Sequence, residues 1–258
     1  MRYYPSLERM KKLSKKRDFY DFYKILERLR GEDGCPWDRA QTHESLKPHL
    51  IEEAYEALEA IDSKNGAKMA DELGDVLLQI VMHALIGKEE GEFDIYDVTE
   101  AASEKMVSRH PHIFGGEHAE TSEDVLDLWD EIKKKERGEK SLSETLSSVS
   151  RALPSIKRAE KLQKKAAKTV SPDESLSDAL AIFKKRAAEL SQDSSKEDFS
   201  SLLFAAARLA TLFDFDSEEL LRQENEKFIK KFENIEKSTC NNERCLVEYP
   251  RVQSTLIL

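Results

Sequence analysis

The sequence predicts an all-α protein built from two related helical-bundle units. Residues that favour helices dominate the composition: 36 % of the 258 residues are charged and 8 % are aromatic, with only nine glycines and seven prolines. Apolar residues recur at helical spacing along most of the chain. The second half also repeats the apolar pattern of the first half, which indicates two copies of one helical unit.

The first half opens with a one-sided helix over residues 19–30. Its apolar stripe consists of Phe19, Phe22, Tyr23, Leu26 and Leu29. Gly31 and Gly34 end this helix, and residues 35–38 are predicted to form a loop. Within that loop we expect Cys35 to be a packed thiol and Trp37 to be the anchoring side chain.

Two longer helices follow, over about residues 45–61 and 67–85, with a break between 63 and 66. The periodicity predicts that one face of each turns inward: Leu50, Ala54, Leu58 and Ile61 on the first, and Met69, Leu73, Val76, Leu77, Ile80 and Ala84 on the second. Beyond Val76 the second helix is apolar almost all round, so it should lie deep in a bundle. Further helices are predicted over 95–109 and 122–136.

These helices make up a first domain over residues 1–136. Residues 137–152, rich in Gly, Ser, Lys and Glu, are predicted to be a linker. A second helical domain is predicted over 153–237. No structure is predicted for the tail over 238–258, because it has no clear pattern.

The first domain carries two acidic pairs on neighbouring helices. Glu53 and Glu56 are three residues apart and share a helix face, and so do Glu72 and Asp75. The short connection makes the helices antiparallel neighbours. Counting outward from Lys64, Glu53 is level with Asp75 and Glu56 is level with Glu72. Four carboxylates are therefore predicted to face one another.

Carboxylates held this close raise one another's pKa and oppose folding unless a cation lies among them. Oxygen ligands of this kind suit Mg²⁺ or Mn²⁺. No Glu is followed by His three residues later, which disfavours a di-iron bundle. The acidic pairs also fit a plain solvated face on a helical protein that binds another protein. Those two interpretations differ in where the carboxylates point.

The second domain keeps the apolar pattern but loses the acids. It has Asp198 in place of Glu72 and Ser201 in place of Asp75. In place of the other acids it has Lys184, Lys185 and Ala188. We expect it to be a degenerate copy without a metal site.

Charge and cysteine usage limit the partners. A formal net charge of -10 disfavours binding to DNA or RNA. The longest apolar run, over 76–86, is too short to span a bilayer, so no membrane association is expected. Three widely spaced cysteines, Cys35, Cys240 and Cys245, do not form a disulfide framework and indicate the cytoplasm.

Four other side chains have open roles. His110 and His112 flank Pro111 and fit either a structural loop or metal ligation, with the structural role favoured. His49 lies one turn before Glu52 and is a candidate for a phosphate contact, about as strong as metal ligation by the two other histidines. Asp38 fits a helix cap or a nucleotide contact equally well.

Three sequence blocks together resemble the MazG family of all-α nucleoside triphosphate pyrophosphohydrolases. The first block is Gly-Cys-Pro-Trp-Asp at 34–38 with Gln-Thr-His at 41–43. The second is the pair of acidic motifs, Glu-Glu-x-x-Glu and Glu-x-x-Asp. The third consists of Lys105, residues 109–114, Trp129 and Lys133. The resemblance covers about residues 19–237 and includes the doubled architecture.

The resemblance implies a homodimer that cleaves nucleoside triphosphates between the α- and β-phosphates, giving a monophosphate and pyrophosphate, in nucleotide-pool house-cleaning. Carried over by position, the metal ligands for Mg²⁺ (or Mn²⁺) are Glu53, Glu56, Glu72 and Asp75. Glu52 joins Glu53 as a catalytic acid near the metal, a candidate to orient or deprotonate the attacking water. Lys105 and Arg109 bind phosphates, with Trp129 and Lys133 near the nucleotide. One alternative is a non-catalytic interaction or regulatory protein. The other is a related pyrophosphohydrolase whose substrate range is restricted to one deoxynucleotide.

Overall fold

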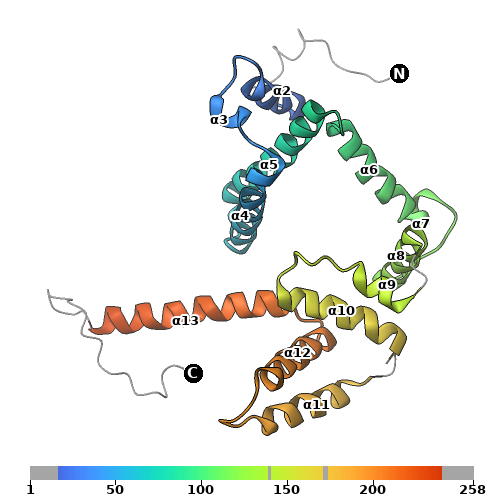
Figure 1. The fold of residues 1–258 in the computed structure, drawn as a ribbon, viewed down its shortest axis with the longest axis vertical. Helices are drawn as coiled ribbons and strands as arrows, with labels where there is room; N and C mark the ends of the chain where they lie inside the picture. Colours follow the sequence, from blue (N-terminus) through green and yellow to red (C-terminus); the bar gives the residue numbers. More distant parts are fainter. Residues whose placement is uncertain (1–16, 139–140, 171–173, 240–258) are drawn as a thin grey trace. The chain divides into compact units, whose positions relative to one another are not determined.

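A computed structural model describes residues 17–138, 141–170 and 174–239. Within these ranges the ordered elements are helices and none is a strand, which confirms the all-α prediction (Figure 1). The chain divides between Ile132 and Lys133 into two compact units, unit 1 and unit 2. Cys240, Cys245 and most of the predicted tail lie outside the described residues. No helix in the described ranges is long and apolar enough to cross a membrane.

Unit 1 begins with a series of capped helices. Asp18, Thr42 and Asp94 each accept a hydrogen bond from the third residue of the helix that follows, which fixes where that helix starts. The helices are α2 (Phe19–Arg30), α3 (Pro36–Arg39), α4 (His43–Asp62), α5 (Gly66–Glu90), α6 (Ile95–Ser108), α7 (Pro111–Phe114) and α8 (Ser122–Arg137), the last of which crosses the boundary between the units. The predicted bounds of α2 match at both ends, whereas α5 extends five residues beyond the predicted end.

The segment predicted as a loop over 35–38 contains α3, because Pro36 occupies the first helical position. Trp37 is 57 % exposed, so the expectation that it anchors this segment by burial is wrong. The anchor is Arg30, whose side chain is only 5 % exposed. Its guanidinium donates hydrogen bonds to the carbonyl oxygens of Asp38, at 2.6 Å, and Gln41, at 3.3 Å, and pairs with both carboxylate oxygens of Glu89.

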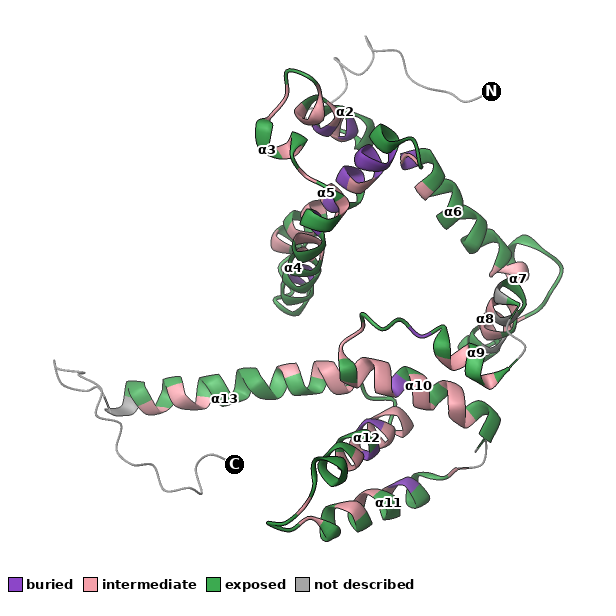
Figure 2. Cartoon of the chain, in the orientation of Figure 1, coloured by how far each residue is buried: buried purple, intermediate pink, exposed green. Residues whose placement is uncertain are grey.

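The core of unit 1 lies around the second half of α5. One buried cluster joins α2, α5 and α6 through Tyr23, Leu26, Val81, Ala84, Leu85 and Ile95. A second joins α4 to α5 through Leu46, Met82 and Ile86. The burial predicted beyond Val76 is therefore confirmed (Figure 2).

The faces predicted to turn inward near the α4–α5 connection are wrong. Leu58, Ile61 and Leu73 are each about half exposed, and Met69 is exposed as well. Farther along α5, Ile80 is also exposed and is an exception to the burial beyond Val76. Helix α4 packs on α5 through Ala57 and Ala60 instead. Their small side chains let the two helices approach closely, and the larger apolar side chains then form a separate exposed stripe.

Two histidines join the start of α4 to the middle of α5. The Nδ1 atoms of His43 and His83 are 2.6 Å apart, and the ring planes differ by 4°. At this distance one nitrogen must donate its hydrogen to the other, so the bond needs one unprotonated Nδ1. Burial, followed by the neighbouring His43, lowers the pKa of His83, and Glu44 opposes this only in part.

This pair predicts a loss of stability in mild acid. Because the pKa of His83 is lowered on folding, the unfolded chain binds a proton first as the pH falls below 6.5. The stability should therefore be complete above that pH and decrease below it, by at most about 1.4 kcal/mol per pH unit. Urea unfolding at pH 5 to 8 measures the effect, and His83→Gln should flatten the profile. A profile that stays equally steep in His83→Gln would refute the assignment.

Unit 2 contains α9 (Leu142–Ser147), α10 (Ser155–Val170), α11 (Leu176–Glu189), α12 (Lys196–Leu212) and α13 (Ser217–Thr239). Helix α12 packs against both α10 and α11. The predicted linker over 137–152 is thus partly helical: Ser141 caps α9, which packs on α10. Buried Glu160 of α10 accepts a hydrogen bond from the backbone N–H of Ser217 at 2.7 Å and so holds the start of α13.

Candidate active site

The α4–α5 hairpin brings three acidic side chains together. A turn at Ser63–Asn65, with Lys64 in the left-handed region, reverses the chain and places the two helices side by side. One carboxylate oxygen from each of Glu53, Glu56 and Glu72 lies within 4.8 Å of the other two. We call these three residues the acidic cluster. It lies near the turn, away from the buried half of α5.

The electrostatics of the cluster follow the predicted register. Burial raises the pKa of Glu53, and the charge that reinforces this most is Asp75. Burial also raises the pKa of Glu72, and there the leading charge is Glu56. Among the neighbouring charges, the one that raises the pKa of each acid most is thus the partner counted as level with it from Lys64. Asp75 acts on the cluster as a fourth negative charge.

The donor set of the cluster fits a divalent cation. Among the described residues, no lysine, arginine or histidine forms an ion pair with any of its three carboxylates. The nearest basic residue that acts on it, Lys68, pairs with Glu59 at 3.1 Å and lowers the pKa of Glu72 only in part. Several carboxylates without a basic partner are the oxygen-rich environment that Mg²⁺ and Mn²⁺ occupy.

Glu52 lies beside the cluster and outside it. Its side chain is 64 % exposed, and one carboxylate oxygen is 3.7 Å from Nδ1 of His49. Its charge contributes to the raised pKa of Glu53. His49 in turn makes an edge contact with the ring of Trp37, at 6.2 Å between centroids. This arrangement connects the segment around α3 to the acidic face of α4.

The predicted phosphate ligands lie on α6. Ile95, at the start of α6, packs against the buried end of α5, roughly 14–20 Å along that helix from Glu72. Lys105 is exposed, and Arg109 is half-buried at the C-terminal end of α6. Helix α6 leads away from the hairpin (Figure 1), so within one chain the structure does not bring these two cations to the acidic cluster.

Trp129 and its neighbours form a ring cluster between α7 and α8. Trp129 lies edge-on to His110 at 4.9 Å, and His112 lies 5.5 Å from His110. Nδ1 of His110 is 2.6 Å from the carbonyl oxygen of Met106, so it carries the hydrogen and donates it. This supports a structural role for His110. Lys133 is half-buried on α8, one residue beyond the boundary between the units.

Sequence reasoning missed two contributors to this region. Arg30 fixes the segment over 35–41, and a basic residue in the last turn before a glycine-rich break was the available signal. Lys68, in the first turn of α5, faces Glu59 across the hairpin. The count that placed Glu56 beside Glu72 also places Lys68 level with Ala60, next to Glu59.

The chain is similar to a known domain and to several known proteins. Residues 41–114 match the MazG nucleotide pyrophosphohydrolase domain, a range that contains the acidic cluster, Asp75, Lys105 and Arg109. A nucleoside triphosphate pyrophosphohydrolase/pyrophosphatase MazG from Thermotoga maritima is 38 % identical, over 90 % of this chain and 91 % of its own length. A nucleoside triphosphate pyrophosphohydrolase from Escherichia coli is 37 % identical, over 83 % of this chain and 85 % of its own length.

A Bacillus subtilis protein, YabN, is 43 % identical over 86 % of this chain, and the match spans 47 % of that longer protein. The match to the Thermotoga protein extends over nearly the full length of both chains and includes both units. Together with the matched domain, these similarities establish that the chain belongs to the MazG nucleotide pyrophosphohydrolase family.

Proposed function

We propose that the protein hydrolyses nucleoside triphosphates to a monophosphate and pyrophosphate, with Mg²⁺ as cofactor and the active site in unit 1. The observation that carries the proposal is the acidic cluster, whose three carboxylates lie within 4.8 Å of one another without a basic partner among the described residues. Relatives named nucleoside triphosphate pyrophosphohydrolase support the reaction class. The cysteine usage supports the cytoplasm as the place of action.

Each side chain has a defined task in this proposal. Glu53, Glu56, Glu72 and Asp75 hold the divalent cation, with Mn²⁺ as a substitute for Mg²⁺. The bound metal supplies charge neutralisation of the triphosphate and polarisation at the attacked phosphorus. Glu53, whose pKa is raised, and the exposed Glu52 orient the attacking water and accept its proton.

Lys105 and Arg109 contact the phosphates, and Trp129 and Lys133 lie near the nucleotide. In a single chain α6 holds the two phosphate ligands away from the acidic cluster. A second copy of the chain, or a movement of α6 on substrate binding, would have to complete the site. Either event places positive charge where negative charge develops during the reaction.

Product analysis tests the reaction directly. Common ribo- and deoxyribonucleoside triphosphates are incubated with the full chain, with Mg²⁺ or with a chelator, and the products are separated by chromatography. Monophosphate and pyrophosphate, formed only with metal, are expected. Release of inorganic phosphate and a diphosphate would refute cleavage between the α- and β-phosphates. Folded protein that turns over none of these nucleotides would favour the interaction-protein alternative.

We also propose that unit 2 is a degenerate copy that serves packing, dimerisation or regulation. Asp198, which replaces Glu72, accepts hydrogen bonds from Ser195 and takes part in the cap of α12. These hydrogen bonds lower the pKa of Asp198. Lys184 and Lys185 are exposed on α11. Lys185→Ala should therefore leave hydrolysis unchanged, and a large loss in this variant would place catalysis in unit 2.

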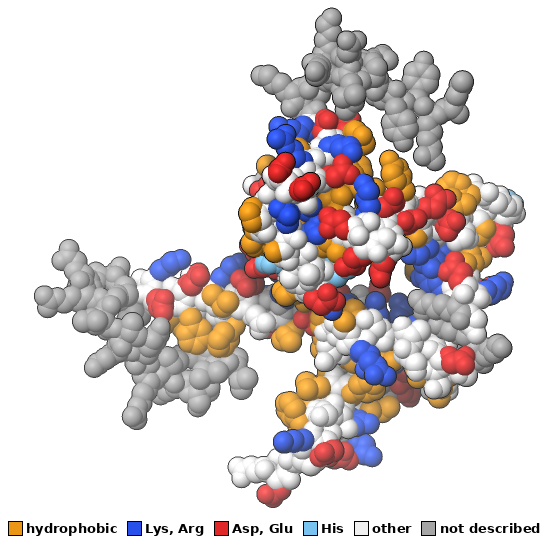
Figure 3. All heavy atoms as spheres, turned by 45° about the horizontal axis from the view of Figure 1, so that its top comes forward, with side chains coloured by type: hydrophobic (Ala, Val, Ile, Leu, Met, Phe, Trp, Pro, Cys, Tyr) orange, Lys and Arg blue, Asp and Glu red, His pale blue; other side chains and the backbone are white. Residues whose placement is uncertain are grey.

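A homodimer is supported by the exposed apolar stripe on the hairpin. On α4 the stripe contains Ile51, Tyr55, Leu58 and Ile61, and on α5 it contains Met69, Leu73 and Ile80. The space-filling view shows hydrophobic side chains gathered on the surface among charged ones (Figure 3). An exposed apolar face of this extent is typical of a surface that another protein covers.

Dimerisation through this stripe predicts a strong effect of one charge. Leu58→Glu should convert the dimer to a monomer, because the variant buries an unpaired carboxylate at the interface. Sedimentation velocity measures the change. Glu59→Gln, on the neighbouring position outside the stripe, should remain a dimer. If Leu58→Glu sediments like the unmodified chain, the stripe is not the dimer interface.

A further inference from the structure

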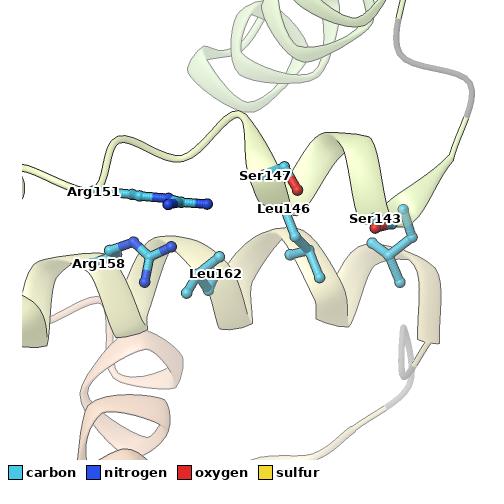
Figure 4. A pocket seen from close by; sticks show the side chains of 7 residues that line it. Ser143, Leu146, Ser147, Arg151, Arg158 and Leu162 are labelled. Carbon is cyan, nitrogen blue, oxygen red and sulfur yellow. The ribbon is translucent and has the colours of Figure 1, made fainter.

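Unit 2 contains a groove whose lining differs in charge from the rest of the chain. It lies between α9, the segment that follows α9, and α10 (Figure 4). Its volume is about 410 Å³, and it is lined by Leu142, Ser143, Leu146, Ser147, Arg151, Arg158 and Leu162. No carboxylate is among these residues, although the whole chain has a formal net charge of -10. We call this feature the arginine groove.

Two arginines enter the groove from different elements. Arg151 extends from the segment between α9 and α10, and Arg158 extends from the first turn of α10 toward the same end of the groove (Figure 4). The Nε atom of Arg158 is buried and has no hydrogen-bond partner. A buried guanidinium N–H without an acceptor is unfavourable, so the site is poised to take one.

Two other arginines of unit 2 are paired with acids within the chain. Arg208 pairs with Glu174 at 2.7 Å, and Arg222 pairs with Glu219 at 2.9 Å. Within the described ranges, neither Arg151 nor Arg158 takes part in an ion pair. Unit 2 contains acidic residues that form salt bridges elsewhere, but none of those described pairs with an arginine of the groove. Two positive charges are thus left facing one space.

The other residues that line the groove indicate the chemistry of a ligand that would fit it. Leu146 and Leu162 form an apolar wall beyond the two guanidinium groups (Figure 4), and Leu142 is a third leucine in the lining. Ser143 and Ser147 add hydroxyl groups that can donate hydrogen bonds. A guanidinium fork matches the oxygens of a phosphate group, and a phosphate monoester carries nearly two negative charges at neutral pH. A carboxylate carries only one.

We propose that the arginine groove binds a phosphate monoester of a small organic molecule. Arg151 and Arg158 hold the phosphate group, and the leucine wall contacts the organic part. The lining residues belong to unit 2 and none of them is assigned to the acidic cluster, so this proposal does not depend on the proposed hydrolysis. It gives unit 2 a ligand of its own.

Phenyl phosphate is the probe, because it joins a dianionic head to an apolar ring. Isothermal titration calorimetry of the full chain in chelator-containing buffer should show one saturable site, with a weaker response to inorganic phosphate and to benzoate. Arg151→Gln and Arg158→Gln should each weaken binding at least tenfold. Arg158→Lys should fall between Arg158→Gln and the unmodified chain, because it keeps the charge and loses the fork.

Matched controls separate the groove from general charge effects. Lys161→Gln removes the same charge from an exposed position on α10 outside the groove and should bind phenyl phosphate unchanged. Glu53→Gln should also bind it unchanged, so a failure of the hydrolase proposal would not affect this result. Arg151 is exposed, and its substitution keeps the test valid if Arg158 variants do not fold. The proposal is overturned if the unmodified chain does not bind phenyl phosphate, if binding survives both arginine substitutions, or if Lys161→Gln weakens it equally.

Discussion

Glu53→Gln is expected to reduce kcat/KM for nucleoside triphosphate hydrolysis by at least about 100-fold, equivalent to about 2.7 kcal/mol of transition-state stabilisation. Glu53 lies between the two helices of the hairpin, where its carboxylate is close to both Glu56 and Glu72. It also interacts with Asp75 on the facing helix. The amide is almost the same size as the carboxylate but removes both the negative charge and the proton acceptor.

The matched control is Glu59→Gln. Glu59 lies on the same helix, is 71 % exposed and pairs with Lys68 rather than joining the acidic cluster. Surface ion pairs of this kind contribute little, so its activity should stay close to that of the unmodified chain. Steady-state kinetics at several Mg²⁺ concentrations distinguish the two variants. An equal loss in both, or full activity of Glu53→Gln, would exclude the acidic cluster as the metal site.

Glu53→Gln, which is expected to lower activity, should raise the stability of the metal-free chain. Since the pKa values of Glu53 and Glu72 are raised in the folded chain, ionising them costs stability as the pH rises through and above their ordinary value of 4.5. At neutral pH without metal, Glu53→Gln should therefore have a higher Tm than the unmodified chain. Mg²⁺ should raise the Tm of the unmodified chain more than that of the variant. A lower metal-free Tm in the variant would indicate that the carboxylates do not repel one another.

The pairing of acidic residues across the α4–α5 hairpin could be predicted, because a short connection leaves the two helices little freedom in how they align. Antiparallel helices joined by three residues must place positions at equal distances from the turn side by side. Counting from Lys64 was therefore enough to pair Glu53 with Asp75 and Glu56 with Glu72. The start of α2 could be predicted for a similar local reason, since Asp18 and Asp21 form a capping box.

The packing face of α4 could not be predicted in the same way. This helix has a large apolar stripe that includes Leu58 and a smaller one that includes Ala57 and Ala60, and periodicity favours the larger. The structure buries the smaller stripe, because close approach of two helices needs short side chains. Among the described residues of one chain, the larger stripe stays exposed.

Contacts between distant residues account for the other differences. Arg30 pairs with Glu89, which is fifty-nine residues away, and no local pattern specifies that pair. Helix α9 is short and polar, and it is held by its Ser141 cap and by packing on α10. Composition alone therefore assigned it to a linker. The arginine groove could not be predicted from the sequence, because its lining comes from α9, α10 and the segment between them together.

Gly34→Ala is expected to destabilise unit 1 by roughly 3 kcal/mol, as severe overpacking does. A Cβ atom at Gly34 would lie 2.2 Å from the carbonyl oxygen of Leu29 and 2.6 Å from that of Arg28. Both are backbone atoms at the end of α2 and cannot turn aside like the tip of a side chain. The adjacent N–H of Cys35 donates to the same Leu29 oxygen at 2.8 Å, so any shift that relieves the overlap also breaks this bond.

Urea unfolding of Gly34→Ala and Gly66→Ala separates this steric effect from the general cost of replacing glycine. A Cβ at Gly66, the first residue of α5, meets no atom within 4 Å, so that variant should be neutral or slightly more stable. In Gly34→Ala the displaced segment also carries the carbonyl oxygens of Asp38 and Gln41, so the buried Arg30 would lose these two acceptors and keep only Glu89. The loss should therefore exceed that from the overlap alone. Equal stability of the two glycine variants would mean that the turn after α2 can rearrange without cost, and that Arg30 does not fix it.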